Sequence, residues 1–529
     1  LAIAFTLAET IGLFTGIFLL IFFNSVRLIY MVRPAELLKG GQIGEKMPKT
    51  KWPLAVLGIV TLAGGYILAL KADNVMTGLN TFFVAVLLVI VGTFSLFTAG
   101  SIAFLKLLQK NKRYYYKTNH FISVSGMIYR MKQNAASLSL ICIMSTGVLL
   151  LISSTTSLYV GQEHSLYMHY PKEFRISLSL GTEPDDSAQF EKELKEIGTY
   201  AENYLKDNKI DVKNEESQTV IDVAALQKDG NVQITSSRIY DSEDFENLCM
   251  LQAVTLEDYN RETKKNETLK DGEALVFLED VPLQQDTFSV NNMKWKVKHL
   301  PEDTRMGDTG LEFYANPVYR IVVKDFAQLQ DLWKINKEVY RENASRVKYE
   351  YSFDVDLPEE KIQKLTSSLH AYFGEQKDAP HAFVYGIENR TEGRVEFYSL
   401  YGGLFFLGIF LGLLFVMATV LIIYYKQISE GYEDKERFAI LKKIGMERGE
   451  INASIHSQVL MVFFLPLVLA GIHSCFAFHL VKEILMGGFG LWDVKLLVLS
   501  AVLTFLAFAA FYVIVYLITA REYYKIVSE

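Results

Sequence analysis

Seven long hydrophobic segments constrain the fold of this 529-residue chain more than any other feature. They carry no Asp, Glu, Lys or Arg, apart from Glu9 near the start of the first. About 20 helical residues cross the ~30 Å hydrocarbon core of a bilayer, and each segment is close to or above that length. The segments cover residues 7–26, 53–70, 79–105, 135–160, 400–425, 455–481 and 496–520. We therefore expect a membrane protein, built as an all-α bundle of seven transmembrane helices.

The basic residues between these segments predict the orientation of the chain. Six Lys and Arg side chains follow the first segment in residues 27–51, against two acidic ones. Residues 106–132 contain seven basic side chains and no acidic ones. Cytoplasmic loops are enriched in Lys and Arg, so both loops are expected inside, together with Lys110 and Lys442. Residues 71–78 and the long insertion at 161–398 are then expected outside the cell.

The insertion at residues 161–398 differs in charge from the rest of the chain. It holds 46 acidic and 29 basic residues, a net charge of −17, whereas the remainder carries +10. An acidic outer domain concentrates cationic ligands by its field, although a solvated surface without a partner explains the same composition equally well. Cys249 is the one cysteine of this insertion, which excludes an internal disulfide there.

Alternation of apolar and polar residues in the insertion predicts an α+β domain. We expect strands at residues 174–180, 274–280, 294–300 and 318–325, and helices at 187–207, 326–340 and 357–374. Aromatic residues such as Trp295, Phe313 and Tyr314 are interpreted as core residues rather than ligand contacts. No ligand-binding residue is therefore assigned in this domain.

A cytoplasmic stretch between the fifth and sixth hydrophobic segments predicts a partner contact. In residues 433–455, with the sequence EDKERFAILKKIGMERGEINASI, Phe438, Leu441 and Ile444 fall at helical spacing. A short amphipathic helix is expected to stop at Gly445, with a second helix restarting at Glu447. Its apolar stripe needs cover from lipid headgroups or from a partner subunit.

Two packing features complete the pattern. Residues 121–131 place Phe121, Val124, Ile128 and Met131 on one helical face, which predicts a helix in the inner membrane interface. Gly12 with Gly16, and Gly408 with Gly412, have the spacing that lets membrane helices approach closely; this spacing also occurs by chance in glycine-rich spans.

The sequence lacks the common motifs of catalytic, nucleotide-binding and metal-binding sites. No GxxxxGK[ST], HExxH, CxxC or GxSxG motif occurs, and GGQIGEK at residues 40–46 has the wrong spacing for a phosphate loop. His473 and His479 are six residues apart, on different helical faces, and are interpreted as structural. No Asp, Glu, Lys or Arg lies in the middle of a predicted span, as proton-coupled carriers and ion channels usually require. The chain is therefore expected to be no enzyme, and to take its energy from another subunit.

At this point the residues resemble a known family. The segment 405–518, and especially ISEGYEDKERFAILKKIGMERGEI at 428–451, is similar to the C-terminal half of FtsX-like ABC-transporter permeases. Four spans, an outer domain and three spans resemble the last seven of ten spans in the bacitracin-resistance, or BceB-like, subfamily. The runs HFISVSGMIYRMKQNAASLSL at 120–140 and VRPAELLKGG at 32–41 also resemble that group. The resemblance implies that three earlier spans and a first coupling helix belong to the whole protein.

The resemblance implies a permease subunit of an ABC transporter that gives resistance to, and in many members senses, cationic peptide antibiotics directed at cell-wall lipid intermediates. ATP and Mg²⁺ would be bound by a separate, homodimeric ATPase subunit, with no cofactor in this chain. Further partners would be a membrane histidine kinase, the peptide or its lipid complex, and membrane lipid, with no nucleic acid. The location would be the plasma membrane of a Gram-positive bacterium. The expected ATPase contacts on the coupling helix are Phe438, Leu441, Lys442, Lys443, Ile444 and Gly445.

Two other functions stay open at this stage. One is a non-transporting FtsX-like regulator that passes force to a cell-wall hydrolase, although such regulators usually have four spans with the outer domain after the first. The other is a permease that extracts lipids or lipoproteins.

The expected organisation follows the chain in eight segments. They are a transmembrane helix ending the first permease half at 1–30, a cytoplasmic loop at 31–52, two transmembrane helices at 53–105, a cytoplasmic loop with the interfacial helix at 106–134, a transmembrane helix at 135–160, the extracellular α+β domain at 161–398, the C-terminal FtsX-like domain at 399–520 with the coupling helix at 433–445, and a cytoplasmic tail at 521–529.

Overall fold

The computed structural model describes most of the chain as two compact units, residues 1–50 and residues 51–529. The described residues are 2–31, 51–72, 75–115, 118–228, 230–235, 247–278, 281–301, 304, 317–443, 448–491 and 493–528. The first unit contributes one 30-residue helix, α1 (Ala2–Met31). All other described elements belong to the second unit.

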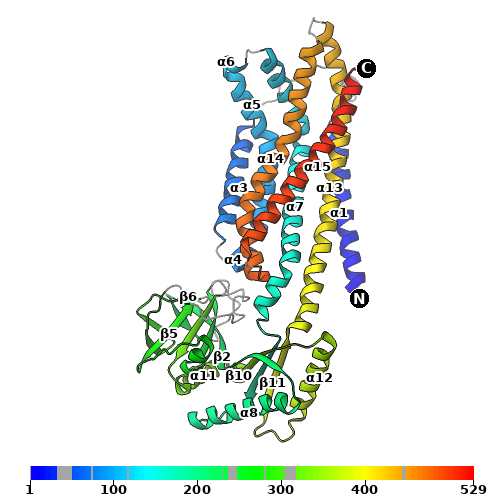
Figure 1. Ribbon diagram of the computed structural model, residues 1–529. Helices are drawn as coiled ribbons and strands as arrows, with labels where there is room; N and C mark the ends of the chain where they lie inside the picture. Colours follow the sequence, from blue (N-terminus) through cyan, green and yellow to red (C-terminus); the bar gives the residue numbers. More distant parts are fainter. Residues whose placement is uncertain are drawn as a thin grey trace. The chain divides into compact units, whose positions relative to one another are not determined.

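Long apolar helices make up the membrane part of the second unit (Figure 1). In chain order they are α3 (Trp52–Leu70), α4 (Val75–Ser95), the π-helical turn η1 (Leu96–Gly100), α5 (Ser101–Lys110), α6 (Lys112–Tyr115), α7 (Thr118–His169), α13 (Arg390–Lys443), α14 (Arg448–Phe489) and α15 (Val494–Ser528).

All seven hydrophobic segments predicted from the sequence are helical. In each, a stretch is long and apolar enough to cross a membrane: Thr10–Arg27, Trp52–Leu70, Thr77–Lys110, Gln133–His169, Arg390–Lys435, Phe463–Phe489 and Val494–Val527. The chain is therefore a multi-pass membrane protein with a sheet-rich domain between α7 and α13.

The helix expected in the inner interface at residues 121–131 is different in the structure. These residues are the first turns of α7, one 52-residue helix that continues into the membrane segment. Val124, Ile128 and Met131 are buried in the bundle core, each 6% exposed or less. The apolar face read as lipid-facing is covered by protein, because Tyr115, Leu105 and other side chains pack against it.

Close packing of α7 against α13 uses the small residues noted in the sequence. A side chain on Gly408 would overlap Thr155 of α7, and a Cβ on Gly412 would lie 2.9 Å from Ile152. Gly147 of α7 similarly faces Phe415, at 3.2 Å from such a Cβ. The spacing of Gly408 and Gly412 is thus a genuine helix-contact motif. Gly12 and Gly16 lie in α1, in the other unit, so their predicted packing role stays a prediction.

The inserted domain is α+β, as predicted (Figure 1). Its helices are α8 (Ser187–Asp207), α10 (Leu256–Thr263), α11 (Phe326–Tyr340), the 3₁₀ turn η3 (Arg341–Asn343) and α12 (Glu359–Glu375). Its strands are β1 (Phe174–Leu180), β2 (Val212–Lys228), β3 (Asn231–Gln233), β4 (Leu248–Thr255), β5 (Glu273–Leu278), β6 (Val281–Pro282), β7 (Thr287–Val290), β8 (Met293–Val297), β9 (Val318–Val323), β10 (Lys348–Val355) and β11 (Phe383–Asn389).

The 17-residue strand β2 organises the sheet, because it takes part in two groups of pairings. On one side, β10, β1 and β11 follow in that order, all antiparallel. In the second group, the order β2, β3, β7, β8, β5, β9, β4 closes into a circuit, since β4 pairs with β2 again, on the side opposite β3 and β10. A closed circuit leaves no free edge among these strands.

The core of this domain is a large apolar cluster around the sheet, which α8 and α11 join through Phe190, Leu194, Leu329 and Leu332. Trp295 belongs to it at 3% exposure and donates a hydrogen bond to Gln328, so its prediction as a core residue is confirmed. Phe313 and Tyr314 lie outside the described residues. Cys249 is buried and free, as expected for a domain that depends on its core.

Candidate functional site

The predicted coupling segment is the end of α13 rather than a separate helix. Residues 433–443 continue the helix that begins at Arg390, 54 residues in all. No proline interrupts this stretch, so nothing in it forces a break. Phe438, Leu441, Lys442 and Lys443 lie in the final turns, and Ile444 and Gly445 lie outside the described residues. The next helix, α14, begins at Arg448, one residue after the expected restart.

Leading into the first residues of this segment, α13 carries three ionisable residues at successive turns. Lys426, Glu430 and Asp434 are spaced by four, which places them along one side of the helix. Glu430 and Asp434 are 7% and 5% exposed. Buried charges need partners, and these come from α7 and α15.

Arg130 of α7 and Tyr523 of α15 close a triangle around Asp434. Arg130 forms a buried ion pair with the Asp434 carboxylate and donates a second hydrogen bond, of 2.9 Å, to the Tyr523 hydroxyl. Tyr523 in turn donates a hydrogen bond of 2.6 Å to Asp434 Oδ2. Arg130 is 3% exposed and Tyr523 is fully buried, so the three helices meet in a contact that excludes water.

Glu430 extends this contact by one turn. Its carboxylate accepts a hydrogen bond from Asn134 of α7 and lies 3.8 Å from Lys426 Nζ and 4.0 Å from Arg130 Nη1. Lys426 also donates to Asn134 Oδ1. The whole set, which we call the polar joint, comprises Arg130, Asn134, Lys426, Glu430, Asp434 and Tyr523. The charges of its two positive and two negative side chains balance, so the set is neutral.

Sequence reasoning missed the polar joint, because it counted Arg130 among the basic residues of a cytoplasmic loop, beside the predicted interfacial helix at 121–131. A signal was present in α13. Two carboxylates four residues apart repel one another on a helix, and they stand directly after an apolar span. A cation from another helix was therefore needed, and Arg130 in the all-basic loop was one candidate.

The opposite end of α13 is fastened to the inserted domain, which is called the outer domain below after its predicted location. Strands β1 and β11 pair along their whole length, from Phe174 opposite Asn389 to Leu180 opposite Phe383. The next residue, Arg390, donates through Nε to the Tyr170 carbonyl at 2.8 Å and lies 4.4 Å above the Tyr167 ring. Thr391 donates to Glu173 at 2.6 Å. The end of α7 and the start of α13 are thus joined where they enter neighbouring strands.

The outer domain contains a polar cavity of about 520 Å³ beside α10 and the first residues of β2. Five carboxylate and five basic side chains line it, so the −17 charge of the domain is not concentrated there. Glu350 on β10 is half-buried in its wall and accepts a hydrogen bond from Gln218 at 3.1 Å. Burial, followed by repulsion from Asp222, raises the pKa of Glu350, which Arg175 and Lys348 partly offset.

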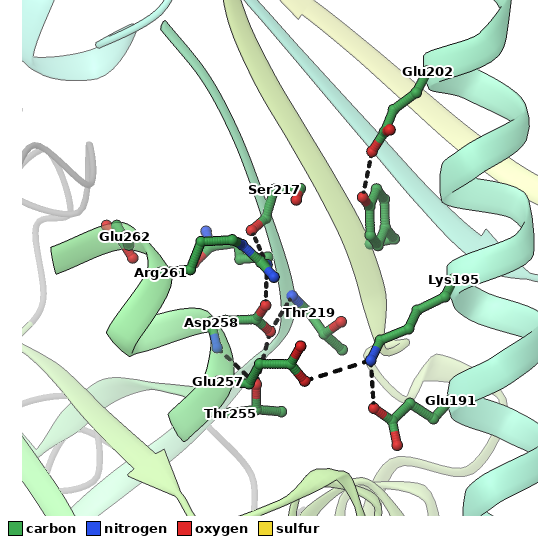
Figure 2. Close-up of polar contacts among 12 residues, drawn as sticks. Glu191, Lys195, Glu202, Ser217, Thr219, Thr255, Glu257, Asp258, Arg261 and Glu262 are labelled. Atoms are coloured by element: carbon green, nitrogen blue, oxygen red, sulfur yellow. Dashed lines mark hydrogen bonds and ion pairs between the residues drawn. The ribbon is translucent and has the colours of Figure 1, made fainter. Parts of the chain in front are cut away.

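Figure 2 shows how one wall of this cavity is held, with α10 fixed against β2 through Asp258. Asp258 accepts hydrogen bonds from the Thr219 amide at 2.9 Å and from Thr255 Oγ1 at 2.8 Å, and it pairs with Arg261. Thr255 is the N-cap of α10 and accepts from the Asp258 amide. Burial nevertheless raises the Asp258 pKa, against these hydrogen bonds and Arg261. In the same view, Lys195 of α8 lies 3.5 Å from Glu257 of α10.

His473 of α14 has a structural environment. Its Nδ1 lies 2.6 Å from the Tyr66 hydroxyl of α3, and its Nε2 lies 3.0 Å from Thr93 Oγ1 of α4. The ring of Tyr66 also stacks on Phe476 at 3.9 Å. Both ring nitrogens are occupied, in agreement with the interpretation of His473 as a packing residue.

Comparison with known proteins identifies relatives for almost the whole chain. Residues 405–527 match the family model described as FtsX-like permease C-terminal. The chain is 26% identical to the ABC transporter permease protein YxdM of Bacillus subtilis, over 87% of this chain and 68% of that protein. It is 25% identical to the bacitracin export permease protein BceB of Halalkalibacterium halodurans, over 89% and 68%, respectively. It is 23% identical to the bacitracin export permease protein BceB of Bacillus subtilis, over 89% of this chain and 69% of that protein.

Proposed function

We propose that this protein, an ABC transporter permease of the FtsX-like family related to bacitracin export permeases, protects a bacterium against cationic peptide antibiotics that bind cell-wall lipid intermediates. In this proposal a separate ATPase subunit hydrolyses ATP and drives the movement. The outer domain, on the extracellular side of the plasma membrane, then detaches the peptide from its lipid target or expels it.

One observation carries the proposal: a single helix connects the outer domain with the predicted ATPase contact. α13 begins at Arg390, immediately after β11, and ends in the coupling segment, inside the region that matches the family model. At 1.5 Å per residue its 54 residues span about 80 Å. Because α7 packs closely along it and enters the neighbouring strand β1, a movement of one end is passed to the other.

The acidic composition of the outer domain supports the proposal that the ligand is cationic. A net charge of −17 over residues 161–398 attracts cations to that face of the membrane. Selectivity would then depend on shape and apolar contacts, because charge alone does not distinguish one cationic peptide from another. A membrane histidine kinase that reads the transporter stays a prediction of the family resemblance.

Susceptibility measurements test the proposal. A strain lacking this gene is exposed to a panel of peptide antibiotics, including bacitracin, and compared with strains complemented by the wild-type gene or by the Tyr432→Phe variant. Tyr432 is 62% exposed on α13, so this variant is a matched control. We expect lost resistance to one or more cationic or lipid-intermediate-binding peptides, restored by both genes. Unchanged susceptibility with a defect in cell separation would favour the hydrolase regulator, and misplaced lipoproteins would favour lipid or lipoprotein extraction.

A further inference from the structure

The polar joint holds three helices together with buried charges, whose desolvation costs free energy. Its Arg130, Glu430 and Asp434 side chains are each 7% exposed or less. Removing charges from water costs free energy that their mutual attraction often only just repays, and apolar residues of similar size would often hold a bundle as well. Stability alone therefore does not account for four charges at this place. Ionic groups do, however, fix one arrangement among several that apolar packing would tolerate.

The position of the joint indicates what it fixes. Asp434 lies four residues, about one helical turn, before Phe438 of the coupling segment. Gly431 of α13 faces α15, since a Cβ there would lie in ordinary contact, at 3.4 Å, with Tyr523 and Ile526. Arg130 lies on α7, which leads to the outer domain at its other end. The joint thus ties the last turns of α13 to both neighbouring helices.

The residue types suit such a contact. The guanidinium of Arg130 is a planar fork, so a single nitrogen, Nη2, reaches both the Asp434 carboxylate and the Tyr523 hydroxyl while Nη1 faces Glu430. Tyr523 accepts from Arg130 and donates to Asp434. Hydrogen bonds to ionised groups are about twice as strong as neutral ones, and all three sides of this triangle are of that kind.

We propose that Arg130, Asp434 and Tyr523 are positioning residues that hold the end of α13 in the one direction in which the coupling segment engages the ATPase. The closed triangle makes α7, α13 and α15 move as one body at this level. When the triangle is opened, α13 turns independently of α7 and α15. The movement driven by ATP hydrolysis then no longer reaches the outer domain. The functional half of this inference, that the triangle couples ATP hydrolysis to the outer domain, rests on the proposed function. The geometric half, that the triangle holds α13 in position, does not.

Spin-label distances in the full chain, reconstituted in lipid nanodiscs, test the geometric half. Labels are placed at Glu433 of α13 and Arg521 of α15, both exposed, after Cys142, Cys249 and Cys475 are replaced. We expect a narrow distance distribution in the otherwise unchanged chain and in Tyr432→Phe. Asp434→Asn and the milder Tyr523→Phe should both broaden it. If neither variant changes the distribution, the joint does not position α13 and the inference is overturned.

Resistance and protein amount in the membrane are measured for the same variants in the complemented strain. Mutations that alter coupling between sites do so by roughly two- to thirty-fold, and we expect a drop in resistance of that order with normal membrane amounts. A broadened distribution with full resistance would contradict the role in coupling. If the wild-type gene gives no resistance to any peptide, the proposed function fails, and the spin-label distances still decide whether the joint positions α13.

Discussion

Arg130 and Asp434 form a buried ion pair although they are 304 positions apart in the sequence. The intervening chain includes the whole outer domain. The pair connects the beginning of α7, before its hydrophobic segment at 135–160, with the part of α13 that follows its hydrophobic segment at 400–425. The two helices that carry the outer domain are therefore joined at both ends, by the β1–β11 pairing at one and by this ion pair at the other.

The topology can be tested by cysteine labelling from outside intact cells. We expect cysteines introduced at Gly161 and Leu400 to react with a membrane-impermeant reagent, and those at Lys110 and Lys442 to stay unlabelled until the cells are opened. The reason is that two separate basic loops indicate the same cytoplasmic side. Labelling at position 442 in intact cells would contradict this orientation.

The coupling segment can be tested with Phe438→Asp and Leu441→Asp, alone and together. An unpaired carboxylate in an apolar contact typically costs about 1–3 kcal/mol or more, so resistance should fall while membrane insertion survives. Asp at the neighbouring exposed Ile440, which is 57% exposed, serves as the control. Full resistance in the double variant would place the ATPase contact elsewhere.

The α7–α13 contact can be tested by enlarging Gly408. Gly408→Leu should separate the two helices, since a side chain there overlaps Thr155, and overpacking of this kind costs about 1–3 kcal/mol. We expect a lower thermal midpoint for the purified full chain. Gly402→Leu is the matched control on the same helix, because no described atom lies within 4 Å of its Cβ position. Equal effects of the two substitutions would exclude a specific contact at Gly408.

Glu350 predicts a pH-dependent stability of the outer domain. Its pKa in the folded chain is raised above its ordinary value of 4.5, so the folded state loses stability as pH rises from that value through the raised pKa. In Glu350→Gln no carboxyl group titrates at this position, so this loss of folding stability is absent. Hydrogen exchange of β2 and β10 in the full chain should therefore be slower than in the wild type at pH 7 to 8.

The difference should shrink as the pH approaches 4.5, where Glu350 takes up a proton in both states. Glu338→Gln, an exposed substitution on α11, should show no such trend. A Glu350→Gln variant that is less protected than the wild type at pH 8 would show that the charged carboxylate stabilises the domain.

Salt should weaken capture of a cationic peptide by the full chain. Exposed charges are screened beyond ~8 Å at physiological ionic strength, so attraction by the −17 domain falls as salt is added. Calorimetric titration with bacitracin and with a more cationic peptide at low and high salt measures this. Binding that does not depend on salt would remove the electrostatic explanation, and no binding at any salt would move recognition to the membrane helices or to the lipid-bound peptide.

The sequence predicted the membrane segments and much of the α+β domain because these depend on local patterns. Strand β1 and helices α8 and α11 begin and end where apolar periodicity placed them. Strands β2, β10 and β11 were missed, because charged residues such as Glu215, Glu350 and Glu388 interrupt their alternation. These side chains are tolerated where the strands line the cavity or form the edge of the sheet.

The polar joint could not be assembled from sequence patterns, because its members come from three helices: Asp434 and Tyr523 are 89 positions apart, and Arg130 is 304 positions from Asp434. Val124, Ile128 and Met131 were correctly placed on one helical face, and the error concerned what covers that face. An apolar stripe next to basic residues is typical of an interfacial helix, but here the neighbouring Arg130 points to Asp434 inside the protein. Only the packing of α7 against α13 and α15 distinguishes the two cases.

The most direct test of the account is ATP hydrolysis by a purified complex of this chain with the proposed ATPase subunit in lipid nanodiscs, measured with and without bacitracin in the presence of bacitracin's lipid target. The account predicts that the peptide changes the hydrolysis rate of the wild-type complex. It also predicts that the rate no longer responds in Phe438→Asp/Leu441→Asp, whereas it still responds in the Tyr432→Phe control. A hydrolysis rate that responds equally in all three complexes would show that the end of α13 does not carry the signal. A wild-type rate that responds neither to bacitracin nor to any other peptide of the panel would contradict the proposed function.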